Sequence, residues 1–145
     1  MTLLIDADWL IYSSCCACEQ DIQWDSNLHT LHADERDVHE MVDGRVAHYQ
    51  TIAEGDKNVV MCFTEYPTFR HTIYPEYKAN RKHKRKPLGL RKIIEGVKER
   101  YTSESYAGLE GDDVMSILAT SKKYDNPIIV SVDKDMRSVP CTLLA

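Results

Sequence analysis

Three short apolar runs, separated by stretches with helical periodicity, constrain the fold of this chain more than any other feature. The runs are residues 2–5, 59–63 and 127–132. Most consecutive side chains within them are apolar, which is typical of a strand buried on both faces of a parallel sheet. Strands that alternate with helices predict an α/β fold with a central, mostly parallel sheet flanked by helices.

The stretches between the runs complete this expected architecture. Apolar residues at helical spacing predict helices over residues 9–19, 34–54, 88–101 and 109–124. Asp34 is the expected cap of the second helix. Short strands are predicted at residues 105–107 and 141–144. Residues 21–33 have no clear period and are predicted as a loop, and residues 64–87 are irregular.

Composition excludes several classes of protein. The chain has 145 residues, which fits one domain, and its 43% hydrophobic content can form a core, unlike a disordered chain. We find no apolar stretch near the ~20 residues of a membrane span and no basic segment typical of a signal peptide. The five cysteines are odd in number, and without an export signal we interpret them as reduced thiols in a cytoplasm.

Acidic side chains follow each of the three apolar runs and also open the last predicted helix. In chain order they are Asp6, Asp8, Glu65, Glu110, Asp112, Asp113, Asp133 and Asp135. Ligand sites in parallel sheets lie beyond the carboxyl ends of the strands, so we expect these side chains to converge on one edge. Crowded carboxylates repel one another, and a divalent cation removes that cost. Oxygen ligands favour Mg²⁺ or Mn²⁺ over zinc, and two such ions ~4 Å apart can activate water on a phosphodiester.

Each group of acids also has a simpler interpretation. Asp6 and Asp8 could form a turn at a strand end, and Asp133 with Asp135 could lie in a solvated turn. Acids in a first helical turn are favoured by the helix dipole by about 0.3–1 kcal/mol each. The occurrence of acids at three strand ends and one helix start together favours the metal site.

A basic segment lies between the acid-bearing segments. The net charge of the chain is −5, yet residues 78–92 hold eight of its 18 Lys and Arg residues and no acid. Such a local field matters more to a polyanion than the global charge does. Tyr77 offers a stacking face, and Lys78 and Arg81 could both hold phosphate if helical. The alternative is a solvated basic loop. The position of this segment between two acid-bearing segments instead favours a path for the substrate beside the metal ions.

Four segments together resemble a known family. They are LIDADWL at residues 4–10, YKANRK at 77–82, LEGDDVM at 109–115 and VDKDM at 132–136. In this order they resemble the flap endonuclease or 5′-nuclease family, and are most similar to the 5′–3′ exonucleases of short-tailed phages. The resemblance implies a PIN-like three-layer nuclease domain that binds two divalent metal ions and cleaves near 5′ ends, flaps or RNA primers.

The resemblance also implies roles for particular residues. The metal-binding residues would be Asp6, Glu65, Glu110, Asp112, Asp113, Asp133 and Asp135. The catalytic set would be Asp6, Asp112 and Asp133, together with Lys78 and Arg81, which would hold the scissile phosphate. The nucleic-acid contacts would be Tyr77, Lys78, Arg81, Lys82, Lys84, Arg85 and Lys86.

The chain departs from the family pattern in two ways. The family usually has Asp after the second strand, where this chain offers Glu65 in a shifted loop. The family pattern also continues beyond residue 145 with a helical element that grips duplex DNA. We therefore expect residues 1–145 to form a single catalytic domain without that element. In the family, that part also adds two further aspartates to the second metal site. A second polypeptide that supplies them is one way to complete the site.

The predicted function is a metal-dependent 5′–3′ exonuclease or flap endonuclease with a two-metal-ion mechanism. Its expected partners are Mg²⁺ or Mn²⁺ and DNA with 5′ ends, flaps or RNA–DNA hybrids, with no membrane. The expected location is the cytoplasm, which for a phage-encoded chain is that of the host. One alternative is a PIN-type ribonuclease acting on single-stranded RNA. Another is a non-catalytic nucleic-acid-binding or assembly subunit of a split nuclease.

Overall fold

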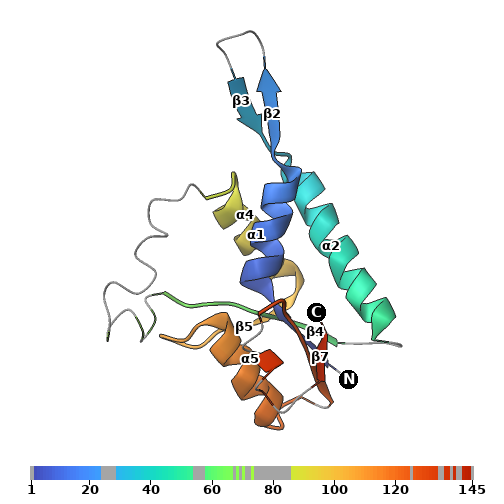
Figure 1. The fold of residues 1–145 in the computed structure, drawn as a ribbon, viewed down its shortest axis with the longest axis vertical. Helices are drawn as coiled ribbons and strands as arrows, with labels where there is room; N and C mark the ends of the chain where they lie inside the picture. The colour runs from blue at the N-terminus through green and yellow to red at the C-terminus, as the bar shows by residue number, and fades with distance from the viewer. Residues whose placement is uncertain are drawn as a thin grey trace.

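Five strands form the central sheet of this computed structural model, and each pair of neighbouring strands is parallel (Figure 1). The strand order is β5-β4-β1-β6-β7. Their bounds are β1 (Thr2–Asp6), β4 (Asn58–Cys62), β5 (Thr102–Glu104), β6 (Pro127–Val130) and β7 (Thr142–Leu144). The structure describes residues 2–23, 29–53, 58–66, 68, 70, 73, 86–124, 126–133, 136, 137, 139 and 142–144. The predicted parallel α/β sheet is confirmed.

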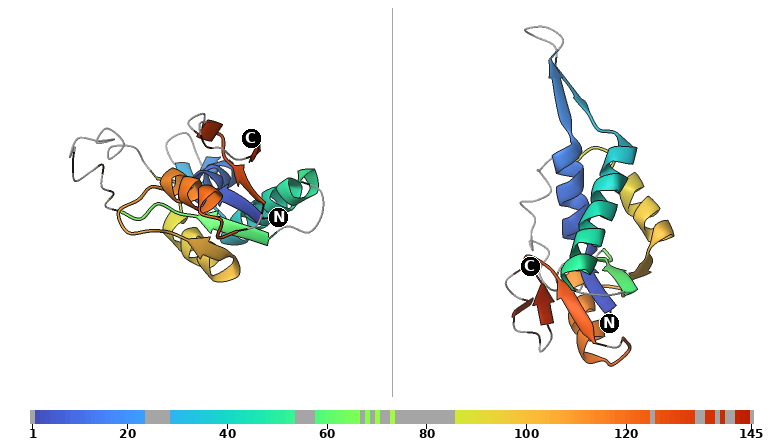
Figure 2. Two further views of the ribbon diagram at one scale, coloured as in Figure 1. Left: turned by 90° about the horizontal axis from the view of Figure 1, so that it is seen from below. Right: turned by 90° about the vertical axis from the view of Figure 1, so that its right-hand side faces the viewer.

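Helices cover both faces of the sheet and make the fold three-layered (Figure 2). The helices are α1 (Ala7–Cys18), α2 (Glu35–Ile52), α4 (Leu90–Arg100) and α5 (Gly111–Thr120). Side chains of β1 alternate between the faces: Leu3 and Ile5 join the core under α1, α2 and α4, whereas Leu4 joins the core under α5. Since all three are fully buried, β1 is the centre of both cores, as its continuous apolar sequence predicts.

Local sequence explains where the helices begin. The Asp34 side chain accepts a hydrogen bond from the Arg36 backbone N–H at 2.9 Å, which confirms Asp34 as the cap of α2. Asp6 plays the same role for α1 by accepting from the Trp9 N–H at 3.4 Å. The last residue of β1 therefore also starts α1, and its side chain stays at the edge of the sheet.

Two expected elements were wrong. Residues 21–33 were predicted as a loop, but β2 (Gln20–Gln23) and β3 (His29–His32) form an antiparallel hairpin that projects from the body (Figure 1). The hairpin lies outside the central sheet, so backbone pairing can hold it without an alternating apolar pattern. Residues 105–107 were predicted as a strand, but the strand is β5, three residues earlier. It starts there because α4 ends at Arg100 and Thr102 pairs at once with Val60 of β4.

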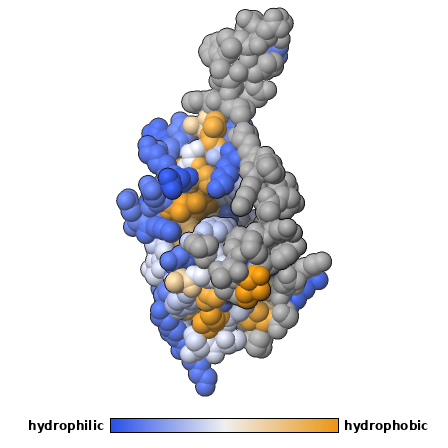
Figure 3. All heavy atoms as spheres, turned by 90° about the vertical axis from the view of Figure 1, so that its left-hand side faces the viewer, coloured by the Kyte–Doolittle hydropathy of each residue, from blue (hydrophilic) through white to orange (hydrophobic). Residues whose placement is uncertain are grey.

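The surface shows no single broad apolar face in the view of Figure 3, where apolar side chains form separate patches among polar ones. Exposed large apolar side chains in the described residues include Tyr12, Ile52, Tyr66 and Val132. Within the described ranges, no helix has the length and hydropathy to cross a bilayer.

Candidate metal centre

The strand order creates a natural ligand site between the carboxyl ends of β1 and β6. From β1 the chain enters α1 on one face of the sheet, whereas Met136, which follows β6, packs in the core on the other face. In open parallel sheets, ligands bind at the carboxyl ends of the strands where connections diverge in this way. Asp6 ends β1 and Asp133 follows β6, so both acids stand at this point.

A serine links these two acids. The Ser131 hydroxyl donates to Asp6 Oδ2 at 3.2 Å and accepts from the Asp133 backbone N–H at 3.1 Å. Ser131 is buried, and it is separated from Asp6 by 125 residues of sequence. The contact therefore ties the end of β6 to the end of β1 and links the Asp133 backbone to Asp6 through one hydroxyl.

A second set of hydrogen bonds places the start of α5 against the end of β4. Asp8 Oδ2 accepts from the Thr64 backbone N–H at 2.8 Å, and Thr64 Oγ1 accepts from the Gly111 N–H at 2.9 Å. A Cβ atom on Gly111 would lie 3.3 Å from both Asp8 Oδ2 and the Cys62 carbonyl oxygen. Glycine at this position lets the backbone of α5 approach the strands closely, which sets the acids of its first turn at the same edge.

A capping box and an ion pair with an arginine fix the acidic side chains at the start of α5. Glu110 caps α5, and Asp113 Oδ2 accepts from the Glu110 backbone N–H at 3.2 Å, so the two form a capping box. Arg70 donates to both oxygens of Asp113, at 2.6 and 3.1 Å, and lies 3.7 Å from Glu110 Oε2. These hydrogen bonds from Arg70 lower the pKa of Asp113. Asp112 is a carboxylate of the first turn of α5, and its Oδ1 accepts from the Asp113 backbone N–H at 3.0 Å.

The pKa values of three other carboxylates, Asp6, Asp8 and Asp112, are raised by burial and by neighbouring negative charges. Burial raises the pKa of Asp6 to about 6, and the charges of Asp8 and Asp112 add to this effect. Burial also raises the pKa of Asp8, with the Glu110 charge acting in the same direction. Partial burial raises the pKa of Asp112, together with the charges of Asp113 and Glu110. Carboxylates from β1, α1 and α5 therefore share one electrostatic environment, as expected from their positions after the strands.

The donor set fits a hard divalent cation. All donors are carboxylate oxygens, and a cation would offset the repulsion that raises the pKa values of Asp6, Asp8 and Asp112. As the side chains lie, no three carboxylate, imidazole or thiolate groups among the described residues are close enough to hold one ion. Ion binding therefore requires carboxylates to turn toward a common point.

Four of the seven acids expected to bind metal are linked by the electrostatic interactions described above: Asp6, Glu110, Asp112 and Asp113. The backbone of a fifth, Asp133, is tied to Asp6 through Ser131. Glu65 lies apart, since its side chain is exposed and its Oε2 accepts from the Ser105 hydroxyl at 3.4 Å. Lys86 is exposed. The other expected site residues, which lie outside the described residues, are Asp135, Tyr77, Lys78, Arg81, Lys82, Lys84 and Arg85.

Sequence reasoning missed three residues that position the site: Thr64, Arg70 and Ser131. Hydroxyl side chains directly after β4 and β6 are a weak signal that could have drawn attention to Thr64 and Ser131. Arg70 had no such signal, because its partner Asp113 is 43 residues away and the pairing depends on tertiary structure.

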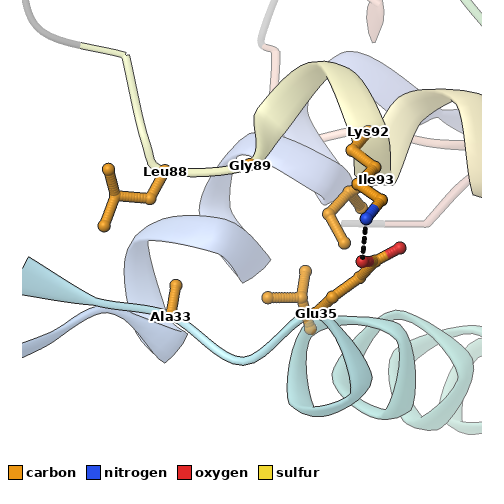
Figure 4. Close-up of a pocket in the computed structure, with 7 residues that line it drawn as sticks. Ala33, Glu35, Leu88, Gly89, Lys92 and Ile93 are labelled. Atoms are coloured by element: carbon orange, nitrogen blue, oxygen red, sulfur yellow. Dashed lines mark ion pairs between the residues drawn. The ribbon is translucent and has the colours of Figure 1, made fainter.

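A pocket in the structure lies elsewhere. It has a volume of about 160 Å³ and lies between the starts of α2 and α4, where Lys92 and Glu35 form an ion pair at 3.1 Å (Figure 4). The labelled residues around it are Ala33, Glu35, Leu88, Gly89, Lys92 and Ile93. No strand-end carboxylate lines it, so the candidate metal centre is a separate cluster at the sheet edge.

Known proteins are similar to this chain over almost its whole length. A family model described as "5′-3′ exonuclease, N-terminal resolvase-like domain" matches residues 1–140. The exodeoxyribonuclease of Enterobacteria phage T3 is 30% identical over 148 residues, covering 95% of this chain and 48% of that protein. The chain thus spans about half the length of the curated relatives it matches.

Solved structures share the fold. T5 5′-exonuclease with bound divalent metal ions (zinc) matches with a TM-score of 0.58 at 17% identity, over 95% of this chain and 51% of that one. A bacteriophage T5 flap endonuclease in complex with DNA and metal ions matches with a TM-score of 0.54 at 13% identity, over 93% and 50% of the two chains. The predicted PIN-like fold class is confirmed by these likenesses.

Proposed function

The chain belongs to the 5′–3′ exonuclease family, carrying its N-terminal resolvase-like domain, and on this premise we propose that it is a divalent-metal-dependent 5′ nuclease. Members of the family are nucleases. The proposed substrates are phosphodiester bonds of DNA or RNA primers at 5′ ends and flaps, and the proposed location is the cytoplasm. Mg²⁺ or Mn²⁺, as two ions, are the proposed cofactors.

One observation carries the proposal: acids from three distant segments lie at the carboxyl ends of neighbouring strands. Asp6 and Asp133 are joined through Ser131, and the charge of Asp112 contributes to the raised pKa of Asp6. A fold that only needed helix caps and turns would have no reason to crowd these charges at one edge, because each buried carboxylate costs stability.

The residues divide into those that hold ions and those that hold substrate. Asp6, Glu110, Asp112 and Asp133 would hold the ions, with Asp135 beside them, and Asp113 would position α5 through its pair with Arg70. When bound, the metal ions supply an activated water and charge stabilisation for the leaving oxygen.

The basic segment supplies the proposed substrate contacts. Lys78 and Arg81 would hold the scissile phosphate, and Tyr77 would stack on a base. Lys82, Lys84, Arg85 and Lys86 would follow the nucleic-acid backbone by charge. A net-acidic chain can bind DNA in this way because eight of its 18 Lys and Arg residues are concentrated in one sequence segment, residues 78–92.

The test is cleavage of a 5′-labelled flap DNA by the purified chain in Mg²⁺ or Mn²⁺, with EDTA as the negative control. We expect Asp112→Asn to lower the rate on the order of 100-fold or more. Asp37→Asn is the matched control, because Asp37 is an exposed acid in the first turn of α2. Equal rates for wild type and Asp112→Asn would refute the assignment.

Two further arms, together with a measurement of DNA binding, separate the alternatives. Single-stranded RNA replaces the flap in the first arm, and faster cleavage of RNA would favour the PIN-type ribonuclease. The second adds the remaining half of a relative as a separate polypeptide, and cleavage only after this addition would favour a split enzyme. DNA binding without cleavage in every arm would favour a non-catalytic subunit.

A further inference from the structure

We propose that Asp8, and not Glu65, supplies the metal-facing carboxylate at the carboxyl end of β4. This inference rests on the proposed function, because it concerns how the same metal centre is completed. The family pattern has an aspartate after the second strand, and the nearest acid following β4 in this chain is Glu65. The structure distinguishes the two candidates by where their side chains lie.

The Glu65 side chain turns toward β5 rather than toward Asp6. Its Oε2 accepts from the hydroxyl of Ser105, which directly follows β5, and its backbone N–H donates to the Leu109 carbonyl oxygen at 3.1 Å. In the strand order β5-β4-β1, β5 is the outer neighbour of β4, whereas Asp6 ends β1 on the inner side. The Glu65 side chain is also exposed. The Ser105 contact directs this side chain toward β5, the outer strand, whereas the Leu109 contact involves only the Glu65 backbone.

Asp8 approaches β4 from the inner side. It lies in the first turn of α1, two residues after the end of β1, and its Oδ2 accepts from the Thr64 backbone N–H at 2.8 Å. Thr64 is the second residue after β4, so this carboxylate crosses from β1 to the end of the neighbouring strand. The chain thus brings a carboxylate to β4 from α1, across 56 residues of sequence.

The start of α5 completes the surroundings of Asp8. Its Oδ2 lies 3.3 Å from the point where a Cβ of Gly111 would stand, and Gly111 separates Glu110 from Asp112. Asp8 therefore lies between the acid of β1 and the acids of α5, where an ion shared by the two elements would sit. A carboxylate has about four acceptor positions, so the hydrogen bond from Thr64 leaves capacity for a cation.

A purely structural role for Asp8 makes a different prediction. If Asp8 only ties α1 to β4, an acceptor oxygen is enough and its negative charge is not needed. Asp8→Asn keeps an acceptor oxygen for the Thr64 N–H and removes the charge. It therefore distinguishes a role in holding α1 against β4 from a role in metal binding. Glu65→Gln is the matched variant at the rival position, and Glu40→Gln changes an exposed acid of α2 as the control.

The experiment is a calorimetric titration of Mn²⁺ into the metal-free chain and these three variants, with Tm measured in EDTA. We expect Asp8→Asn to weaken Mn²⁺ binding about tenfold or more, since affinity follows the number of charged ligands. We expect its Tm in EDTA to be equal to or above that of the wild type. Glu65→Gln and Glu40→Gln are expected to bind Mn²⁺ as the wild type does.

The outcomes separate this inference from the proposed function. Wild-type affinity in Asp8→Asn overturns the role of Asp8 and leaves the proposed function standing, and a loss confined to Glu65→Gln assigns the role to Glu65. Failure of the wild type to bind Mn²⁺ overturns both.

A measurement on the wild type covers the case in which Asp8→Asn does not fold. On Mg²⁺ addition, the ¹³C carboxyl signal of Asp8 should move while that of Glu65 stays in place, and the reverse pattern overturns the inference.

Discussion

Replacing Asp6 with Asn should make the metal-free chain more stable while abolishing cleavage. Burial, together with the charges of Asp8 and Asp112, raises the pKa of Asp6 from 3.8 to about 6. A shift of one pKa unit corresponds to about 1.4 kcal/mol, so the ionised Asp6 costs on the order of 3 kcal/mol at pH 7. Asn removes this cost and is itself a good helix cap, so it can still accept from the Trp9 N–H.

The pH dependence follows from the same shift. Between pH 4 and pH 6 the folded chain holds a proton on Asp6 that the unfolded chain has released, so stability falls as pH rises through this range. The metal-free wild type should therefore become more stable on acidification from pH 7 to pH 5, and Asp6→Asn should lack this part of the response. Asp113 and Glu104 act oppositely, because their lowered pKa values make stability fall at still lower pH.

The assay is urea unfolding in EDTA at pH 5, 6, 7 and 8, followed by circular dichroism. At pH 7 we expect Asp6→Asn to exceed the wild type by on the order of 3 kcal/mol, or roughly 5–10 °C in Tm. Mn²⁺ should raise the Tm of the wild type but not that of the variant, because only a chain that binds the ion gains stability from it. A variant that is less stable in EDTA, or that keeps the wild-type pH response, would refute the reasoning.

Two further substitutions and one labelling experiment test other parts of the structure. Gly111→Ala places a methyl group 3.3 Å from the Cys62 carbonyl oxygen, so we expect a loss of about 1–3 kcal/mol in urea unfolding and slower flap cleavage. Arg70→Gln removes the paired hydrogen bonds to Asp113 and should cost about 1.5–3 kcal/mol by the same measurement, with Arg70→Lys restoring little because Lys cannot bind both oxygens in parallel. In a thiol-labelling time course, Cys16, which is exposed, should react first among the four cysteines that the structure describes. Cys62 should react only on unfolding, because it is buried and burial raises the pKa of its thiol. Wild-type stability in either variant, or early labelling of Cys62, would contradict these assignments.

Local sequence patterns determined most of the architecture. The apolar runs marked β1, β4 and β6 because a strand buried on both faces needs consecutive apolar residues. Helical spacing marked α1, α2, α4 and α5, and Asp34 marked the start of α2, since both signals lie within a few neighbouring residues. The acids were also found from sequence, because each stands directly after a strand or in a first helical turn.

Tertiary structure decided what these local signals could not. The β2–β3 hairpin has no apolar alternation, and β5 is defined by its pairing with β4 rather than by its own three residues. The contacts that organise the site join residues 125 positions apart for Ser131 and Asp6, 43 for Arg70 and Asp113, and 56 for Thr64 and Asp8. Such contacts depend on strand order and on how closely α5 packs on the sheet. A side chain's neighbours in space are therefore set by the burial of whole elements, whereas the sequence around it specifies only the element to which it belongs.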